Sequence, residues 1–261
     1  MNPKPPYGSI PEQLEGMHGM TIAAGFFCKT GIIVAADTRY ITSKSRKQDG
    51  PKVGAVQGKH GSFGIAVATS DGYAAKSLLA RILMGLENTS ARKFSGVESL
   101  VEKHMKTWWA AFGRNKPPDI QFVLGAVLKG VPRLYFCEPP NTVYHDADYV
   151  GVGSGANTMQ SLVGVLFPGY DYTVRQRLWQ IAYLFYRAKK EDAFCGGHTM
   201  PIYLPTDGRG PQRVAVWDME AAEQLGQEFD GILRDCLTTH FDVENERMKS
   251  VTFSPADDSG S

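Results

Sequence analysis

Short apolar runs alternate with helical repeats along the chain after residue 20. The runs Thr21–Cys28 and Gly31–Ala36 are separated only by Lys29 and Thr30, which predicts a β-hairpin. The second run is continuous rather than alternating, and this is typical of a strand that is covered on both faces. We therefore expect the hairpin to lie inside the protein.

The remaining elements are expected in the order strands, two helices, strands, two helices, strands, helix. Such an order indicates sheets with helices outside them rather than a simple repeat of strand, helix and parallel strand. Residues 39–52 are polar and basic and suggest a loop or an edge strand. Strands are expected at 60–69, 119–128, 132–138, 142–152, 199–204 and 212–217, and helices at 75–83, 97–108, 156–167, 173–190 and 219–238.

The two ends of the chain differ in composition from its middle. Residues 1–19 contain four prolines and no apolar segment of the kind a secretory signal needs. The last residues are rich in Ser, Asp and Gly. We expect a leader or propeptide at 1–20, one domain at 21–240 and a flexible tail at 241–261.

Composition and charge exclude several classes of protein. The 261 residues are 43% hydrophobic and carry a net charge of +1, so nothing indicates a nucleic-acid surface. No apolar run approaches the roughly 20 residues of a membrane helix. The four cysteines are widely spaced and the six histidines are scattered, which favours a reducing, cytoplasmic location and neither a metal nor another cofactor.

Four segments carry a resemblance to a known family. The first is the opening pattern, in which Thr21-Ile-Ala-Ala-Gly is followed by Gly31-Ile-Ile-Val-Ala-Ala-Asp-Thr-Arg39. The other three are Pro51-Lys-Val53, Gly151-Val-Gly-Ser-Gly155 and Asp192-Ala-Phe-Cys-Gly-Gly197. In this order and spacing they resemble the N-terminal-nucleophile hydrolases of the proteasome β-subunit type. The chain is identified by this resemblance as a divergent, bacterial-type member.

The resemblance implies a four-layer αββα sandwich and a threonine-type amidohydrolase or peptidase. Thr21 would be the nucleophile, and its own α-amino group, with a pKa near 8, would be the base that a weakly nucleophilic hydroxyl needs. Lys52 would lower the pKa of both groups, and Asp37 would hold Lys52 in place. The other implied site residues are Arg39, Ser154, Asp192 and Cys195, with the backbone N–H of Ala68 as the oxyanion donor.

The same resemblance implies a substrate pocket and partners. Tyr40, Gly50, Ala66 and Ser70 would line the pocket for the residue before the cleaved bond, and the small Gly50 and Ala66 would leave room for a large side chain. The substrate would be a peptide or another amide. The family favours homo-oligomers, including rings, and neither nucleic acid nor a membrane is expected as a partner.

This chemistry requires Thr21 to be the first residue of the active chain. One route is cleavage of a propeptide, although the family usually has glycine before the threonine and Met20 stands there. The other route is translation from Met20 and removal of that methionine. If Met20 were instead the first mature residue, the nucleophile would be absent.

Two other functions stay open. A non-catalytic, ring-forming subunit would keep residues 1–20 attached, and Thr21 would then be an ordinary strand residue. A nucleotide-binding enzyme would use the glycine turn, because Gly151-Val-Gly-Ser-Gly-Ala156 also satisfies the relaxed dinucleotide-binding pattern, with Asp171 as its acidic residue.

Overall fold

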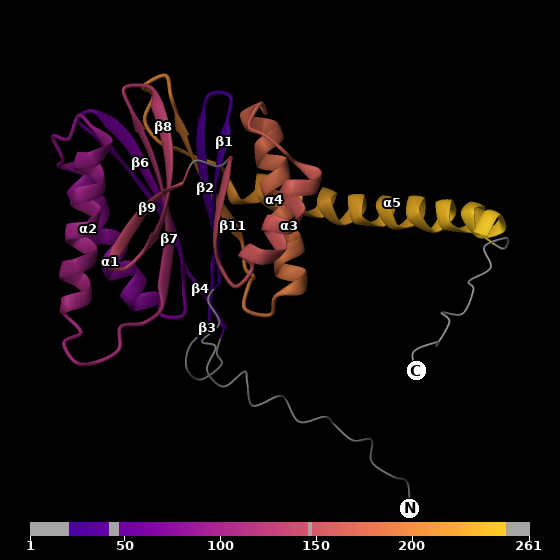
Figure 1. The fold of residues 1–261 in the computed structure, drawn as a ribbon, viewed down its shortest axis with the longest axis horizontal. Coiled ribbons are helices and arrows are strands. Elements are labelled where there is room, and N and C mark those ends of the chain that lie inside the picture. The colour runs from indigo at the N-terminus through magenta and orange to yellow at the C-terminus, as the bar shows by residue number, and fades with distance from the viewer. Residues whose placement is uncertain (1–20, 42–46, 146–147, 249–261) are drawn as a thin grey trace, which may run out of the picture.

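The computed structural model describes residues 21–41, 47–145 and 148–248, and in these it shows a mixed α/β fold with antiparallel sheets (Figure 1). One five-stranded sheet has the order β10-β1-β2-β11-β12, and the other has the order β5-β6-β7-β8-β9. In the first sheet the strands are β1 Ile22–Cys28, β2 Gly31–Asp37, β10 Tyr149–Gly153, β11 Thr199–Pro205 and β12 Gln212–Arg213. In the second they are β5 Val53–Gly58, β6 Gly61–Thr69, β7 Ile120–Leu128, β8 Val131–Glu138 and β9 Asn141–His145.

The predicted hairpin is confirmed. Strands β1 and β2 pair antiparallel from Ala23 opposite Ala36 to Cys28 opposite Gly31. All seven residues of β2 are buried, as expected for a strand covered on both faces. A separate two-stranded sheet joins β3 Arg39–Ile41 to β4 Lys47–Asp49, within the region where we expected a loop or an edge strand.

Three strand predictions need correction. The single strand expected at 142–152 is two strands, β9 and β10, which belong to different sheets. The strand expected at 212–217 ends at Arg213, because a helix begins at Val216. Strand β5 was not predicted, since its sequence VGAVQG is short, contains two glycines and has only a partly buried face.

The two sheets pack face to face through small and branched side chains. Val34 and Leu204 of the first sheet contact the second sheet where it has Gly64 and Gly125, and a Cβ added at either glycine would lie 3.0–3.2 Å from these side chains. Leu204 is fully buried at this point. The absence of side chains at two positions of the second sheet therefore lets the sheets approach each other closely.

Pairs of helices cover the outer faces of the sheets (Figure 1). Helices α1 Gly72–Glu87 and α2 Phe94–Ala110 pack on the β5–β9 sheet, and α3 Ala156–Leu166 and α4 Val174–Glu191 pack on the other. These are the four helices that the apolar spacing predicted. The N-terminus of α1 is capped by the Asp71 carboxylate, which accepts the N–H groups of Tyr73 and Ala74 at 2.8 and 3.0 Å.

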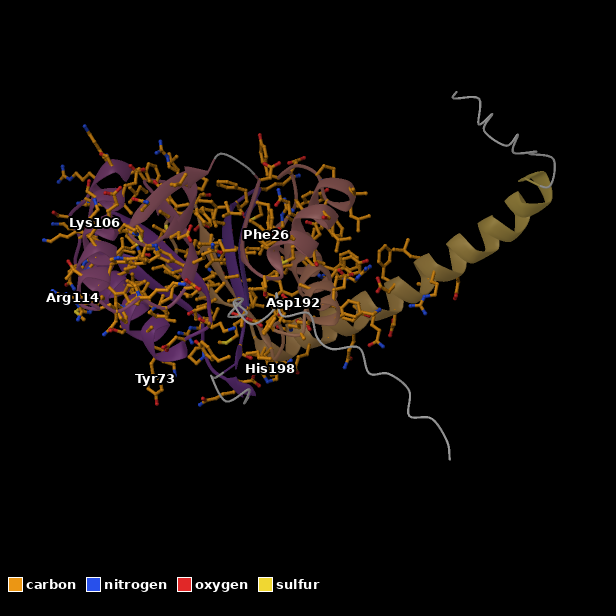
Figure 2. All side chains as sticks on the ribbon, turned by 60° about the horizontal axis from the view of Figure 1, so that its bottom comes forward. Phe26, Tyr73, Lys106, Arg114, Asp192 and His198 are labelled. Atoms are coloured by element: carbon orange, nitrogen blue, oxygen red, sulfur yellow. The ribbon has the colours of Figure 1, made fainter. Side chains whose placement is uncertain are left out.

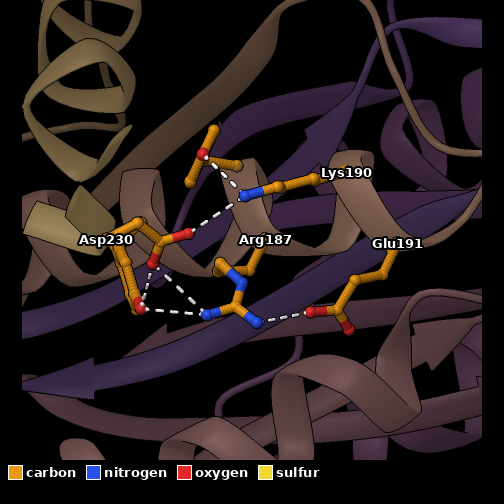
Figure 3. Close-up of polar contacts among 6 residues, drawn as sticks. Arg187, Lys190, Glu191 and Asp230 are labelled. Carbon is orange, nitrogen blue, oxygen red and sulfur yellow. Dashed lines mark hydrogen bonds and ion pairs between the residues drawn. The ribbon is translucent and has the colours of Figure 1, made fainter. Parts of the chain in front are cut away.

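The last helix, α5 Val216–Met248, is longer than the predicted 219–238 and extends away from the rest of the protein (Figure 1). Its helical backbone thus continues through 241–248, where a tail was expected. Its first half is fixed to α4 by a polar cluster around Asp230 (Figure 3). The Asp230 carboxylate accepts from the Tyr183 hydroxyl at 2.9 Å and lies 3.3 Å from both Arg187 and Lys190.

Leu204→Ala should destabilise the fold by about 2–5 kcal/mol, because it removes buried methyl groups and leaves a cavity between the sheets. Urea unfolding followed by tryptophan fluorescence measures this loss. The control is Val165→Ala on α3, where the side chain is 78% exposed, and its cost should stay within about 0.5 kcal/mol. A Leu204→Ala cost as small as that of the control would contradict this packing.

Asp230→Asn should cost about 1–3 kcal/mol at neutral pH. Partial burial raises the pKa of Asp230, but the Tyr183 hydroxyl and the charges of Arg187 and Lys190 outweigh it and lower the pKa below the ordinary carboxyl value of 3.8. The stabilisation is therefore present above that value and lost as the pH falls through the lower, folded-state pKa. Urea unfolding of both proteins should show a constant difference from pH 7 to pH 5 that shrinks below about pH 4. A difference that is independent of pH would contradict this assignment.

Candidate active site

Most of the predicted catalytic residues gather at one edge of the two sheets. Thr21 precedes β1 and Asp37 ends β2, so the antiparallel hairpin brings both to the same edge. Lys52 precedes β5, the glycine turn 153–155 follows β10, and the loop 192–197 connects α4 to β11. Figure 2 looks toward this edge and labels Asp192 and His198 on it.

Asp37 and Lys52 form a buried ion pair at the centre of this edge. The Nζ atom of Lys52 lies 2.5 Å from Oδ1 of Asp37, and neither side chain is exposed. The second carboxylate oxygen accepts the Gly196 N–H at 2.8 Å, and the Ile22 N–H also bonds to this carboxylate. Burial raises the pKa of Asp37 and lowers the pKa of Lys52, and their mutual attraction opposes both shifts. The pair therefore joins β1, β2, the start of β5 and the loop 192–197.

Thr21 is fully buried at the start of β1. Its Oγ1 atom has no hydrogen-bond partner among the residues that the structure describes. Because side chains alternate along a strand, Thr21 continues the face of Ala23, which packs between the two sheets. A buried hydroxyl without a partner costs free energy and needs an explanation, and among the described residues Thr142 and Tyr149 also have such a hydroxyl.

The glycine turn after β10 packs directly against Thr21. Gly153 has a φ of +90°, and a Cβ at this position would overlap the Thr21 carbonyl oxygen and lie 2.8 Å from the Cβ of Ala68. Glycine is therefore required for this approach. The Gly153 N–H donates to the side-chain oxygen of Gln121 at 3.2 Å. Sequence analysis missed Gln121, although a polar residue within the apolar strand IQFVLGAVL was a detectable signal.

The loop 192–197 brings Cys195 to the other side of the turn. The thiol of Cys195 donates to Asp192 at 3.4 Å, and its Sγ atom lies 2.7 Å from where a Cβ on Gly155 would stand. Burial and the charges of Asp37 and Asp192 raise the pKa of Cys195, so this thiol stays protonated at neutral pH. Ser154 lies half-buried in the turn between the two glycines.

Arg39 supports the loop through its backbone and side chain. Its N–H donates to the Gly196 carbonyl at 3.2 Å, and its guanidinium donates to the Cys195 carbonyl at 3.2 Å. Thr38, which sequence analysis missed, accepts the His198 N–H at 2.9 Å. Both residues therefore help to fix the shape of the loop.

The backbone N–H of Ala68, the predicted oxyanion donor, faces strand β7. The N–H of Val67 donates to the Lys52 carbonyl at 2.9 Å, toward β5. Because N–H groups alternate in direction along a strand, the N–H of Ala68 faces β7, where Ala68 pairs with Gln121. The N–H of Thr69, at the end of β6, faces the same side as that of Val67.

The expected substrate pocket is largely filled. The Tyr40 ring is only 6% exposed, lies 4.8 Å from the Lys52 Nζ atom and donates its hydroxyl proton to the Pro51 carbonyl at 2.9 Å. Its edge lies 3.1 Å from where a Cβ on Gly50 would stand, so the ring takes the room that Gly50 suggested. Ala66 is buried in the core between the sheets, and Ser70 follows β6 at the site edge.

The described residues do not show the arrangement that nucleotide binding by the glycine turn would need. Strand β10 lies at the edge of its sheet and pairs antiparallel with β1, and α3 is followed by α4 rather than by a parallel strand. Within the described ranges no group of three or more His, Cys, Asp or Glu side chains could hold a metal ion. The three cysteines whose side chains the structure describes, Cys28, Cys137 and Cys195, are free thiols.

Comparisons with known proteins identify the fold. No family model and no curated protein matches the chain. Solved structures that match it include Anbu from Hyphomicrobium sp. strain MC1, with 16% identity, a TM-score of 0.68 and coverage of 84% of this chain and 97% of that one. The chain has the fold of Anbu proteins.

Two further Anbu structures agree. Anbu (ancestral beta-subunit) from Yersinia bercovieri is 13% identical with a TM-score of 0.69, and the match covers 90% of this chain and 100% of that one. The helical assembly of the Anbu complex from Pseudomonas aeruginosa is 15% identical with a TM-score of 0.71, and the match covers 90% of this chain and 99% of that one. At these identities the likeness shows the fold alone.

The family assignment made from the motifs is therefore corrected. The matching solved structures described above are Anbu proteins, and no model of the N-terminal-nucleophile hydrolase family matches the chain. Four short segments were not enough to show membership of that family. No helix of the described part is long and apolar enough to cross a membrane.

Lys52→Met should destabilise the protein by about 3–5 kcal/mol, because it leaves the Asp37 carboxylate buried without its cation. The double variant Asp37→Leu/Lys52→Met should cost less than the sum of the single variants, since it leaves no buried charge unpaired. Denaturant unfolding of all four proteins measures this coupling. The control is Lys116→Met, which removes an exposed ion pair to Asp119 and should change stability by less than about 0.5 kcal/mol. Equal effects at Lys52 and Lys116 would contradict the importance of the pair.

Proposed function

We propose that this protein is a threonine-type amidohydrolase or peptidase whose nucleophile is Thr21 in chains that begin at that residue. The observation that carries the proposal is the buried Thr21 hydroxyl, which has no hydrogen-bond partner among the described residues and lies at the same edge as the Asp37–Lys52 pair. A hydroxyl that is kept free of hydrogen bonds is available to the α-amino group of its own residue.

The proposed scaffold is a four-layer αββα sandwich that comprises residues 21–240, with residues 1–20 as a leader. Support for the layers comes from the three apolar cores. One lies between α1, α2 and the β5–β9 sheet, one lies between the two sheets, and one lies between the first sheet and α3, α4 and α5. The site is then at the edge of the two central sheet layers.

The proposed reaction begins when the Thr21 amine, neutral after a modest fall from its usual pKa near 8, takes the proton of Oγ1. The oxygen attacks the amide carbonyl carbon, and the carbonyl oxygen becomes negatively charged. The intermediate collapses when the C–N bond breaks and the leaving nitrogen receives the proton from the Thr21 ammonium. Water then hydrolyses the ester on Oγ1 by the reverse sequence of proton transfers and releases the acid.

The surrounding residues have separate roles in this proposal. The Lys52 cation lowers the pKa of the amine, and Asp37 fixes the position of Lys52. Ser154, Cys195 and Asp192 surround the amine, and Cys195 serves as a protonated donor. The direction of its N–H makes Thr69 a better candidate than Ala68 for the oxyanion donor.

The proposed substrate is a peptide or another amide with a small side chain before the cleaved bond, because the Tyr40 ring fills the space beside Gly50. We also propose that the chain forms a homo-oligomer, since a protein of similar fold is described as a helical assembly.

The second candidate function is a non-catalytic subunit. It is favoured by Met20, which stands where a self-cleaving precursor of this type would have glycine. In a chain that keeps residues 1–20, the Thr21 nitrogen is an amide rather than an amine, so the base is absent.

The test is covalent labelling by a β-lactone probe, followed by intact mass spectrometry. The chain that starts at Thr21 should gain one probe mass, whereas the Thr21→Ala variant and the full chain with intact residues 1–20 should gain none. In the folded fraction of the Lys52→Met variant, labelling should be slower by about tenfold, because an amine with its usual pKa near 8 is mostly protonated at pH 7.

Thr107→Ala is the matched control, because Thr107 lies exposed on α2 and bonds only to the Lys103 carbonyl in its own helix. It should label like the unmodified chain. No labelling of a folded chain that starts at Thr21 would reject the hydrolase and leave the non-catalytic subunit.

A further inference from the structure

Six basic residues gather at the end of the β5–β9 sheet that is distant from the candidate active site. We call them the basic patch: Lys59, His60, Arg92, Lys93, Lys129 and Arg133. They come from the β5–β6 turn, the residues before α2, and the β7–β8 turn with the start of β8. The register places Gly61 opposite Leu128, which brings the two turns together. Thr69 and Ile120, at the other ends of the same strands, lie at the site edge.

Positive charge is poorly compensated in the basic patch. Among the described residues no carboxylate forms an ion pair with Lys59, Arg92, Lys93 or Lys129. The pKa of His60 is lowered, first by partial loss of solvent and then by the charges of Arg92, Lys59 and Lys129. The patch therefore carries a positive potential that an acidic ligand would neutralise.

The basic patch also has a shape that suits a side chain of a partner. Arg92, Lys93, Lys129 and Arg133 line a surface hollow together with Glu98, which lies 3.7 Å from Arg133, and with apolar groups that include Phe94 and Val131. Val131 is 53% exposed. Lys93 is the residue before α2 and gives no side-chain cap, so the positive end of the helix faces this hollow. The hollow thus combines cations with an apolar floor.

Helix α5 has the opposite character. Between residues 216 and 248 the sequence has nine acidic and two basic residues, although the whole chain has a net charge of +1. Three of the acidic residues, Glu220, Glu223 and Asp230, are already paired with His198, Lys189 and Arg187 of the same chain. Asp218 and Glu228 are exposed and form no ion pair with a described residue. Leu225 and Ile232 are 52% and 60% exposed and share a helix face with Glu228. A single helix that extends into water is only marginally stable, and packing of this acidic, partly apolar face against another surface would stabilise it.

We propose that the α5 helix of one copy docks in the basic patch of the next copy, with its carboxylates on the patch cations and its exposed apolar residues against Phe94 and Val131. Within one chain the two surfaces cannot meet, because α5 extends from the side of the protein opposite α2 (Figures 1 and 2). The contact is therefore between different surfaces of successive copies, which builds a ring or an open helix. This inference rests on the proposed homo-oligomer and is independent of Thr21.

Charge reversal tests this contact by sedimentation velocity on the full chain. The patch variant Lys93→Glu/Lys129→Glu and the helix variant Asp218→Lys/Glu228→Lys should each raise the concentration for half-assembly by about tenfold or more at low salt. The chain that carries all four substitutions should return to within about threefold of the unmodified protein, since the reversed surfaces attract again. The control Lys103→Glu/Arg114→Glu changes two exposed cations elsewhere and should assemble normally.

Several outcomes would overturn the proposal. One is assembly of the patch variant and of the helix variant at the same concentration as the unmodified protein. Another is failure of the variant with all four substitutions to recover assembly. A third is a loss of assembly in the control variant Lys103→Glu/Arg114→Glu that is as large as in the patch and helix variants. A patch variant that loses binding to inorganic polyphosphate but still assembles normally would assign the patch to another anion.

The same substitutions, made in the chain that starts at Thr21, separate this inference from the proposed function. Probe labelling of chains that start at Thr21 should persist in the reversed variants, because neither surface touches the site edge. An unmodified protein that stays monomeric at all concentrations would reject both this contact and the homo-oligomer. Assembly that no variant changes would reject only this contact.

Discussion

The buried ion pair between Asp37 and Lys52 is the interaction on which the rest of the site depends. Two charges removed from water remain stable only if each has close partners, and here the carboxylate has the Lys52 ammonium and two backbone N–H groups. Asp37 and these three partners belong to four separate parts of the chain. The pair therefore sets the relative positions of β1, β2, β5 and the loop 192–197, and with them the surroundings of Thr21.

Much of the fold and of the candidate site could be predicted from the sequence, because the signals were local. Continuous apolar runs predicted β1 and β2, helical spacing predicted α1 to α4, and motif spacing brought Asp37, Lys52 and Cys195 to one site. The features that could not be predicted depend on tertiary contacts. The N–H direction of Ala68 follows from the pairing of β6 with β5 and β7, and the position of the Tyr40 ring follows from its contacts with Pro51 and Lys52. The spacing of residues along the sequence predicts neither the N–H direction nor the position of the ring.

The strands of the second sheet separate the candidate active site from the basic patch. One end carries the candidate chemistry, and the other carries the basic patch beside α2, about the length of a nine-residue strand away. Helix α5 leaves from the opposite side and is anchored by Asp230. Assembly through α5 would thus leave the site edge uncovered, and each property can be altered by substitutions that do not touch the other.

A crystal structure of the chain that begins at Thr21, solved after reaction with a β-lactone, tests the central claim most directly. We expect an ester on the Oγ1 atom of Thr21, with the Asp37–Lys52 pair intact beside it and the carbonyl oxygen of the ester directed at the N–H of Thr69. An adduct on the sulfur of Cys195, or an unmodified Thr21 whose hydroxyl lies beyond hydrogen-bonding reach of its own amine, would contradict it.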